Sequence, residues 1–178
     1  MTEGKIISER IDGMNTGIIN QEENDFQTEL AHRYLTFVID KQYYAFPITA
    51  LREIIEIQEV SPVPEFPSYA KGIINIRGDI VPVIDVRLRF KKPEVEYTSR
   101  TCIIIVNSGS LNIGFIVDYV DEVRDIKGTD ISPAPKLTNN AAKYVSGIGK
   151  VDNKLVIVLD AEYLIADEDH TLFTQYLE

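Results

Sequence analysis

The chain has 178 residues, enough for one domain or for two small units that share a core. Hydrophobic residues make up 44% of it and charged residues 26%, a balance that excludes global disorder. The net charge of −10, the absence of tryptophan and the lack of a basic stripe argue against a nucleic-acid partner.

The amino-terminal segment is polar, and we expect residues 1–33 to form a flexible arm that is helical near residues 22–33. It lacks the apolar stretch of a secretory signal, and no part of the chain approaches the roughly 18 apolar residues of a membrane span. We therefore expect a cytoplasmic protein without direct membrane insertion. The only cysteine, Cys102, stands in an apolar run and is expected to be a buried small hydrophobe.

From Tyr34 onward the pattern is that of short strands. YLTFVID and YYAFPI form a predicted hairpin that turns at Asp40-Lys41-Gln42. ALREIIEIQEV follows as a strand whose first turn is compatible with a helix. SPVPEFP cannot continue a ladder, because proline lacks the N–H donor. GIINIRGDIVPVIDV then predicts two strands joined at Arg77-Gly78-Asp79.

After a charged loop at residues 91–100, the same order of elements recurs. TCIIIVNSGSLNIGFIV predicts a hairpin, DEVRDI a strand, SPAPKL a proline-rich segment and YVSGIGKVDNKLVIVLDA a hairpin turning at Asp152-Asn153. The spacing agrees with a duplication, since Gly72 and Gly147 are 75 positions apart. The chain therefore contains two like halves.

The duplication predicts an all-β fold of two small five-stranded β-barrel subdomains packed around a shared hydrophobic core. A unit of about 60 residues is marginal alone, and closing each sheet removes exposed edges. We expect one domain over residues 34–165, with barrels at about residues 34–95 and 100–165, and exchange of strands between them stays open. The groove between the barrels is a natural place for a partner. Residues 166–178 are expected to form a C-terminal helical tail.

The sequence offers no catalytic constellation and no metal site. His32 and His170 lie in acidic flanking segments without a second ligand at a suitable spacing. Phosphate-binding loops and a nucleophile elbow are absent from the sequence. We expect no enzymatic activity, no metal and no cofactor.

Two groups of aspartates have simpler explanations than chemistry. Asp85 and Asp160 each end a matched strand, which predicts a capping or turn role. A second group does not have the spacing of a calcium loop and is interpreted as a solvated acidic face. Its members are Asp118, Asp121, Asp125 and Asp130.

The features that indicate binding are stronger. The turn at Arg77-Gly78-Asp79 places a guanidinium at a hairpin tip, where Gly78 can adopt positive φ. Glu53 on the preceding strand can meet Arg77 across the barrel as a charge-assisted pair. From the residues alone, the alternative that Arg77 is a solvated turn residue stays open.

At residues 72–90, GIINIRGDIVPVIDVRLRF closely resembles the CheW family of bacterial chemotaxis adaptors, and the resemblance extends over residues 34–165. Its most specific part is Gly-x-x-Asn-x-Arg-Gly followed by Val-Pro-Val-Ile-Asp. The resemblance implies two packed β-barrels and an adaptor without catalysis. Such an adaptor bridges the histidine kinase CheA to the cytoplasmic tips of chemoreceptors, the methyl-accepting chemotaxis proteins, and lets them control kinase autophosphorylation.

The resemblance also implies partners and partner-binding residues. The regulatory domain of CheA would pair barrel to barrel, and the receptor tip would lie between the barrels of a protein recruited to membrane receptor arrays. The alternatives are a CheW-like adaptor for a non-flagellar kinase pathway and a β-barrel that binds a ligand or an oligonucleotide. The partner-binding residues carried over are Leu51, Glu53, Gly72, Asn75, Arg77, Val117 and Val120.

Overall fold

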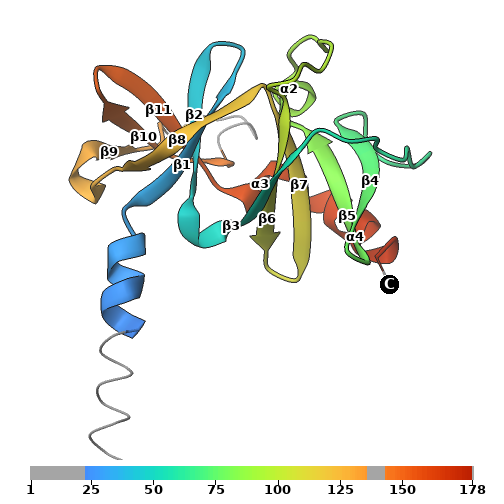
Figure 1. Cartoon of the computed structure of the whole chain (residues 1–178), viewed down its shortest axis with the longest axis horizontal. Helices are drawn as coiled ribbons and strands as arrows, with labels where there is room; N and C mark the ends of the chain where they lie inside the picture. Colours follow the sequence, from blue (N-terminus) through green and yellow to red (C-terminus); the bar gives the residue numbers. More distant parts are fainter. Residues whose placement is uncertain (1–22, 136–142, 178) are drawn as a thin grey trace, which may run out of the picture.

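The computed structural model describes residues 23–135 and 143–177, and it consists mainly of strands in two sheets that lie side by side (Figure 1). A helix over residues 23–30 precedes the first strand and projects away from the body. Most of the expected flexible arm, residues 1–22, lies outside the described residues. In the described part, no helix has both the length and the apolar character needed to cross a membrane.

Sheet A has six strands in the order β8, β1, β2, β11, β10, β9. Its strands are β1 (Arg33–Ile39), β2 (Gln42–Pro47), β8 (Tyr119–Asp125), β9 (Ile131–Pro133), β10 (Val145–Val151) and β11 (Lys154–Leu159). Sheet B has five strands in the order β3, β6, β7, β5, β4. Its strands are β3 (Leu51–Glu56), β4 (Ala70–Ile76), β5 (Asp79–Asp85), β6 (Cys102–Ser108) and β7 (Leu111–Val117).

Short helices connect and flank the sheets. They are η1 (Ile48–Ala50), α2 (Val86–Arg89), η2 (Gly128–Asp130), α3 (Ala161–Leu164) and α4 (Asp167–Gln175). The helix η1 ends at Ala50, the first residue of ALREIIEIQEV, so this segment enters the strand β3 directly and its first turn is not helical.

Each sheet combines strands from both halves of the duplication. The β1–β2 hairpin of the first half pairs with β8 on one side and, in parallel, with β11 on the other. The β6–β7 hairpin of the second half pairs with β3 and, in parallel, with β5. The two spatial units are therefore residues 51–117 and residues 33–47 together with 119–159. The first hairpin of each half is thus part of the sheet that the other half mainly forms.

The expected all-β architecture around a shared core is confirmed, but the two closed five-stranded barrels are not. The sheets have six and five strands, and within the described residues each keeps two end strands, β8 and β9 in sheet A and β3 and β4 in sheet B. Between β3 and β4 runs the proline-rich segment, which pairs with β4 only at Ser61–Ile73. Because proline has no N–H to donate, this segment cannot complete the ladder.

The largest hydrophobic cluster lies between the two sheets. It takes fully buried side chains from both, and the rings of Phe46 on β2 and Phe115 on β7 meet at 5.3 Å between centroids. Two smaller clusters complete the packing, one around Ile105 of sheet B and one around Ile126, which directly follows β8 of sheet A. Because the main cluster belongs to both sheets, neither unit has a complete core of its own.

The described strands are joined by four two-residue hairpin turns, all where the sequence predicts them. The β6–β7 turn consists of Gly109 and Ser110, with positive φ at Gly109 alone, and the other three share one geometry. The central residues are Asp40 and Lys41, Arg77 and Gly78, and Asp152 and Asn153, and all six have positive φ. Positive φ at both positions is the geometry that matches the right-handed twist of the flanking strands.

The predicted capping roles of Asp85 and Asp160 are confirmed. The carboxylate of Asp85 accepts hydrogen bonds from the backbone N–H groups of Arg87 and Leu88 at the start of α2. Asp160 accepts one from the N–H of Glu162 at the start of α3. Each strand is thereby followed at once by a helical turn, since the carboxylate satisfies donors that the turn leaves unpaired.

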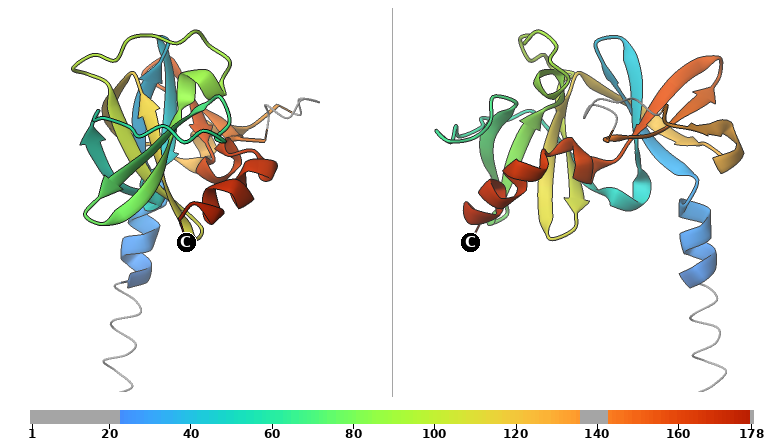
Figure 2. Two further views of the ribbon diagram at one scale, coloured as in Figure 1. Left: turned by 90° about the vertical axis from the view of Figure 1, so that its right-hand side faces the viewer. Right: turned by 180° about the vertical axis from the view of Figure 1, so that it is seen from behind.

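The expected helical tail over residues 166–178 contains the helix α4, which is separated from α3 by the extended residues Ile165 and Ala166. The helix α4 lies beside sheet B (Figure 2). Phe173 of α4 is fully buried and meets the ring of Phe66 edge-on at 4.9 Å. The hydroxyl of Tyr69 donates a hydrogen bond to Asp169. The C-terminal helix α4 therefore packs against the proline-rich segment and the residues that follow it.

Two tyrosines are expected to make the fold sensitive to alkali. Removal from water, strengthened by a neighbouring carboxylate, raises the pKa of Tyr69 beside Asp169 and of Tyr97 beside Asp85. Tyrosine in the unfolded chain has a pKa of about 10. Above that pH the unfolded chain loses protons that the folded chain keeps, so the free energy of unfolding falls as pH rises. Absorbance of tyrosinate during an alkaline titration should show a late step from these two rings. Tyr69→Phe, at the half-buried ring, should remove part of that step, and Tyr163→Phe, at an exposed ring, should not.

Candidate functional site

Arg77 stands at the tip of the β4–β5 hairpin in a conformation that is unusual for its residue type. Its φ is +49°, and its side chain is 71% exposed. Turns of this geometry favour asparagine or glycine at that position, because a side chain with Cβ is strained there. An exposed arginine held in a strained conformation indicates a function other than stability.

The guanidinium of Arg77 is oriented by Glu53 on β3. Arg77 Nη2 lies 2.6 Å from Glu53 Oε1, and the Glu53 side chain is 23% exposed. Arg52 extends the group, with its Nε 3.9 Å from Glu53 and its Nη2 2.8 Å from Asp79 Oδ2. Two cations and two anions thus alternate across the end of the sheet, so the group fixes the direction of Arg77 without adding net charge.

Asn75 supports the same turn from within. Its Oδ1 accepts a hydrogen bond of 2.9 Å from the backbone N–H of Gly78. The side chain therefore holds the loop that presents Arg77, in the way asparagine commonly stabilises turns.

These residues surround a shallow groove between the two end strands of sheet B. Its volume is ≈ 550 Å³. Ile55, Ile57 and Ile76 give it an apolar floor, and charged and amide side chains form its rim. The rim residues are Glu53, Glu56, Gln58, Asn75 and Arg77. We call this the Arg77 groove. An apolar floor with an oriented guanidinium at its edge suits a protein segment better than a small polar ligand.

Two other predicted residues of the first half do not line the groove. Leu51, the first residue of β3, is half-buried and packs against the shared core. Gly72 is buried, with φ +141°, and a Cβ there would lie 1.9 Å from the backbone oxygen of Ser61. The need for glycine at position 72 is therefore explained by the close passage of the proline-rich segment.

The structure does not bring the two residues of the second half to this site. Val117 on β7 is 1% exposed and belongs to the shared core, so it presents no surface to a partner. Val120 on β8 is half-buried against the same core. Both lie where the chain crosses from sheet B to sheet A, and apolar packing accounts for their type.

Five residues of the groove lining were not singled out from the sequence, namely Ile55, Glu56, Ile57, Gln58 and Ile76. Nor were Arg52 and Asp79, which pair with each other beside the groove. Their signal was present in the alternation of LREIIEI and in the turn residue that follows Gly78. The prediction for Asp118 was also wrong, because its carboxylate is not part of a solvated face but accepts hydrogen bonds from Nε and Nη2 of Arg87, at 2.8 and 2.7 Å. In the described part of the chain, no group of three or more His, Cys, Asp or Glu side chains is arranged to hold a metal ion.

Comparison with known proteins gives a consistent result. Residues 33–169 match the family model of the CheW-like domain. The chemotaxis protein CheW of Klebsiella aerogenes is 31% identical over 144 residues, which are 80% of this chain and 87% of the relative. That of Helicobacter pylori is 32% identical over 145 residues, 82% and 86% of the two chains. The crystal structure of the scaffolding protein TtCheW from Thermoanaerobacter tengcongensis superposes with a TM-score of 0.72 at 32% identity, covering 76% of this chain and 93% of that one.

Proposed function

Because the chain belongs to the CheW-like family and is a chemotaxis coupling adaptor, we propose that it joins the histidine kinase CheA to the cytoplasmic tips of chemoreceptors. In this role it acts by binding alone, without catalysis, in the cytoplasm and at membrane receptor arrays. Receptor state then reaches the kinase through two protein contacts made by one small β fold. The Arg77 groove is one of those contacts, and the kinase's regulatory domain and the receptor tip are its candidate occupants.

The conformation of Arg77 is the observation that carries this assignment. The residue has positive φ, is exposed, and is oriented by Glu53, which is itself held by Arg52. A surface ion pair contributes only about 0–1 kcal/mol to stability, so folding gives little reason to keep arginine at a position that favours asparagine. Exposed arginines beside apolar floors are frequent anchors of protein interfaces.

Replacing Arg77 by asparagine separates binding from stability. Asparagine suits the turn, so the free energy of unfolding of Arg77→Asn should stay within about 1 kcal/mol of the parent or rise. Affinity for one partner should fall about thirtyfold, the effect of losing an interface anchor worth about 2 kcal/mol. Arg77→Glu, which also repels Glu53, should abolish receptor control of kinase autophosphorylation in a folded protein. Titration of the purified kinase regulatory domain and of a receptor cytoplasmic fragment measures both affinities.

Lys91→Asn is the matched control. Lys91 is another exposed cation with positive φ, at +57°, but it lies after α2 and outside the groove. Its replacement should leave both affinities unchanged. Parent-like titration curves for Arg77→Asn with both partners, together with normal receptor control by Arg77→Glu, would remove the groove from the coupling mechanism.

A further inference from the structure

A second depression lies beside the short helix α3. Its volume is ≈ 290 Å³, just below the range of about 300–1,000 Å³ that is usual for drug-sized ligands, so it suits a smaller molecule. The β6–β7 turn, the ends of β2 and β11 and the helix η1 surround it. No described residue lines both this depression and the Arg77 groove. We call it the Ser108 pocket.

Ser108, the last residue of β6, brings a buried hydroxyl to this pocket. The residue is 8% exposed, and in the described part of the chain its Oγ is the single buried side-chain oxygen or nitrogen without a hydrogen-bond partner. Alternation along β6 places Ser108 on the same face as Ile104 and Val106, and Ala161 of α3 belongs to the cluster on that face. The hydroxyl therefore points to the side on which α3 and the pocket lie.

The polar neighbours of Ser108 in the pocket are engaged elsewhere. The hydroxyl of Ser146 donates to the carbonyl oxygen of Val158 at 3.2 Å, and the carboxylate of Asp160 accepts the backbone N–H of Glu162 at 3.0 Å. A buried polar group without a partner destabilises a fold, so such groups are rare. A ligand in the pocket would supply the partner that the protein itself does not.

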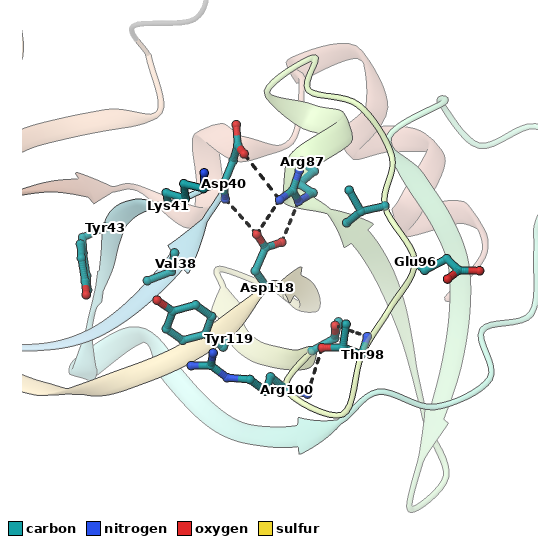
Figure 3. A pocket seen from close by; sticks show the side chains of 12 residues that line it. Val38, Asp40, Lys41, Tyr43, Arg87, Glu96, Thr98, Arg100, Asp118 and Tyr119 are labelled. Atoms are coloured by element: carbon teal, nitrogen blue, oxygen red, sulfur yellow. Dashed lines mark hydrogen bonds and ion pairs between the residues drawn. The ribbon is translucent and has the colours of Figure 1, made fainter.

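The charge of the Ser108 pocket is entirely negative. Asp160 and Glu162 line it, no described lining residue is basic, and neither carboxylate forms an ion pair within residues 23–135 and 143–177. Figure 3 shows a hollow of a different kind, of ≈ 560 Å³, beside the β1–β2 turn at the other end of β2. Three acidic and three basic side chains line that hollow, so its charge selects no ligand. The Ser108 pocket, in contrast, favours a cation.

The remaining walls of the pocket are apolar, from Pro47, Ala50, Leu159 and Ala161. From this combination we infer that the Ser108 pocket binds a small primary alkylammonium compound. An ammonium group has three N–H donors and no acceptor, which suits one hydroxyl oxygen and two carboxylates. The short alkyl chain lies against the apolar walls. The inference does not rest on the proposed coupling role and gives the adaptor a site for a small molecule.

Other cations fit this lining less well. Quaternary ammonium groups are usually held by aromatic rings, and the described lining contains none. A divalent metal ion needs more oxygen ligands, and within the described residues no three His, Cys, Asp or Glu side chains are grouped to hold one. A primary ammonium group needs only hydrogen-bond acceptors beside an apolar wall, and the pocket offers both.

The test titrates the full chain, labelled with ¹⁵N, with n-butylammonium chloride at constant ionic strength. The largest NMR shift changes should fall on residues 107–109 and 159–162, which line the pocket. Glu162→Gln should weaken binding about fivefold, as expected for an exposed charge pair of about 1 kcal/mol. Glu168→Gln is the matched control, because Glu168 is an exposed acid on α4 outside the pocket, and it should leave binding unchanged.

Ser108→Ala separates the binding role of the hydroxyl from a structural one. Because the hydroxyl has no partner in the free protein, this variant should unfold at the same urea concentration as the parent or at a higher one. It should nevertheless bind n-butylammonium about fivefold more weakly, since the ammonium loses one acceptor. A hydroxyl with a purely structural role would give the opposite pattern.

Four results would overturn the proposal. They are an equal response to n-butanol, which has the same chain without the charge, the absence of shifts at the pocket, equal weakening by Glu162→Gln and Glu168→Gln, and unfolding of Ser108→Ala at a clearly lower urea concentration. Arg77→Asn leaves the Ser108 pocket intact and should not change the binding of n-butylammonium. Failure of this proposal is therefore distinguishable from failure of the Arg77 groove.

Discussion

Replacing Gly72 by alanine is expected to lower the free energy of unfolding by about 4 kcal/mol or more, the combined effect of backbone strain and overpacking. Gly72 has φ +141°, and the added Cβ would lie 1.9 Å from the oxygen of Ser61 and 2.9 Å from the Cα of Pro62. Both obstacles are backbone, so neither can swing aside. Relief requires breaking the paired hydrogen bonds between Ser61 and Ile73, each 2.9 Å long. Urea unfolding measures the loss.

Two further glycines make this test specific. Gly78 has φ +94° but open space around it, so Gly78→Ala should lose only the backbone strain, about 1–2 kcal/mol. Gly147, the counterpart of Gly72 in the second half, would place its Cβ 2.5 Å from the side-chain Cγ2 of Ile131 and 3.0 Å from the backbone oxygen of Ser132, a less severe backbone approach than at Gly72. Its replacement should therefore also be milder than that of Gly72. Equal losses for all three would show that the passage of the proline-rich segment is not the cause.

Replacing Arg87 by methionine should cost about 2–3 kcal/mol, less than a fully buried pair because water still reaches both partners. The Arg87 side chain is 13% exposed and that of Asp118 is 23% exposed. Methionine keeps the apolar stem but leaves Asp118 without its counter-ion. Since Arg87 belongs to α2 beside sheet B and Asp118 leads into sheet A, the loss should fall on the junction between the two units.

A double-mutant cycle with Asp118→Asn separates the pair from its surroundings. We expect a coupling energy of about 1.5–3 kcal/mol, typical of a hydrogen bond to a charged group. Arg33→Met is the matched control, because the Arg33 pairs with Glu29 and Asp125 are exposed. It should cost less than about 1 kcal/mol. A coupling energy near zero for Arg87 and Asp118 would mean that the ion pair does not hold the units together.

Local chemistry made much of this structure predictable. The tight turns follow from short polar breaks between apolar runs, where Asp40, Gly78 and Asn153 tolerate positive φ. The helix starts follow from Asp85 and Asp160 at the ends of hydrophobic strands. The duplication showed that Gly72 and Gly147 occupy equivalent places, and both adjoin a proline-rich segment in the structure. The position of Arg77 at a hairpin tip was predictable for the same reason.

Long-range strand pairing was not predictable, because the sequence of a hydrophobic strand does not specify which other strand it pairs with. The parallel pairing of β2 with β11 and of β5 with β7 decides which hairpin joins which sheet. Val117 was expected from the family resemblance to be a contact residue, but the core shared by the two sheets buries it. Asp118 looks solvated among other aspartates, because its counter-ion Arg87 is 31 positions away.

The exchange of hairpins has a consequence for the nascent chain. Residues 51–117 contain all of sheet B, so this unit can form its hydrogen bonds as soon as that stretch has left the ribosome. The β1–β2 hairpin is made earlier, yet it waits for β8 and finally for β11 at residues 154–159. The first strands to be synthesised are thus among the last to be paired on both sides, and they expose their aromatic face throughout that delay.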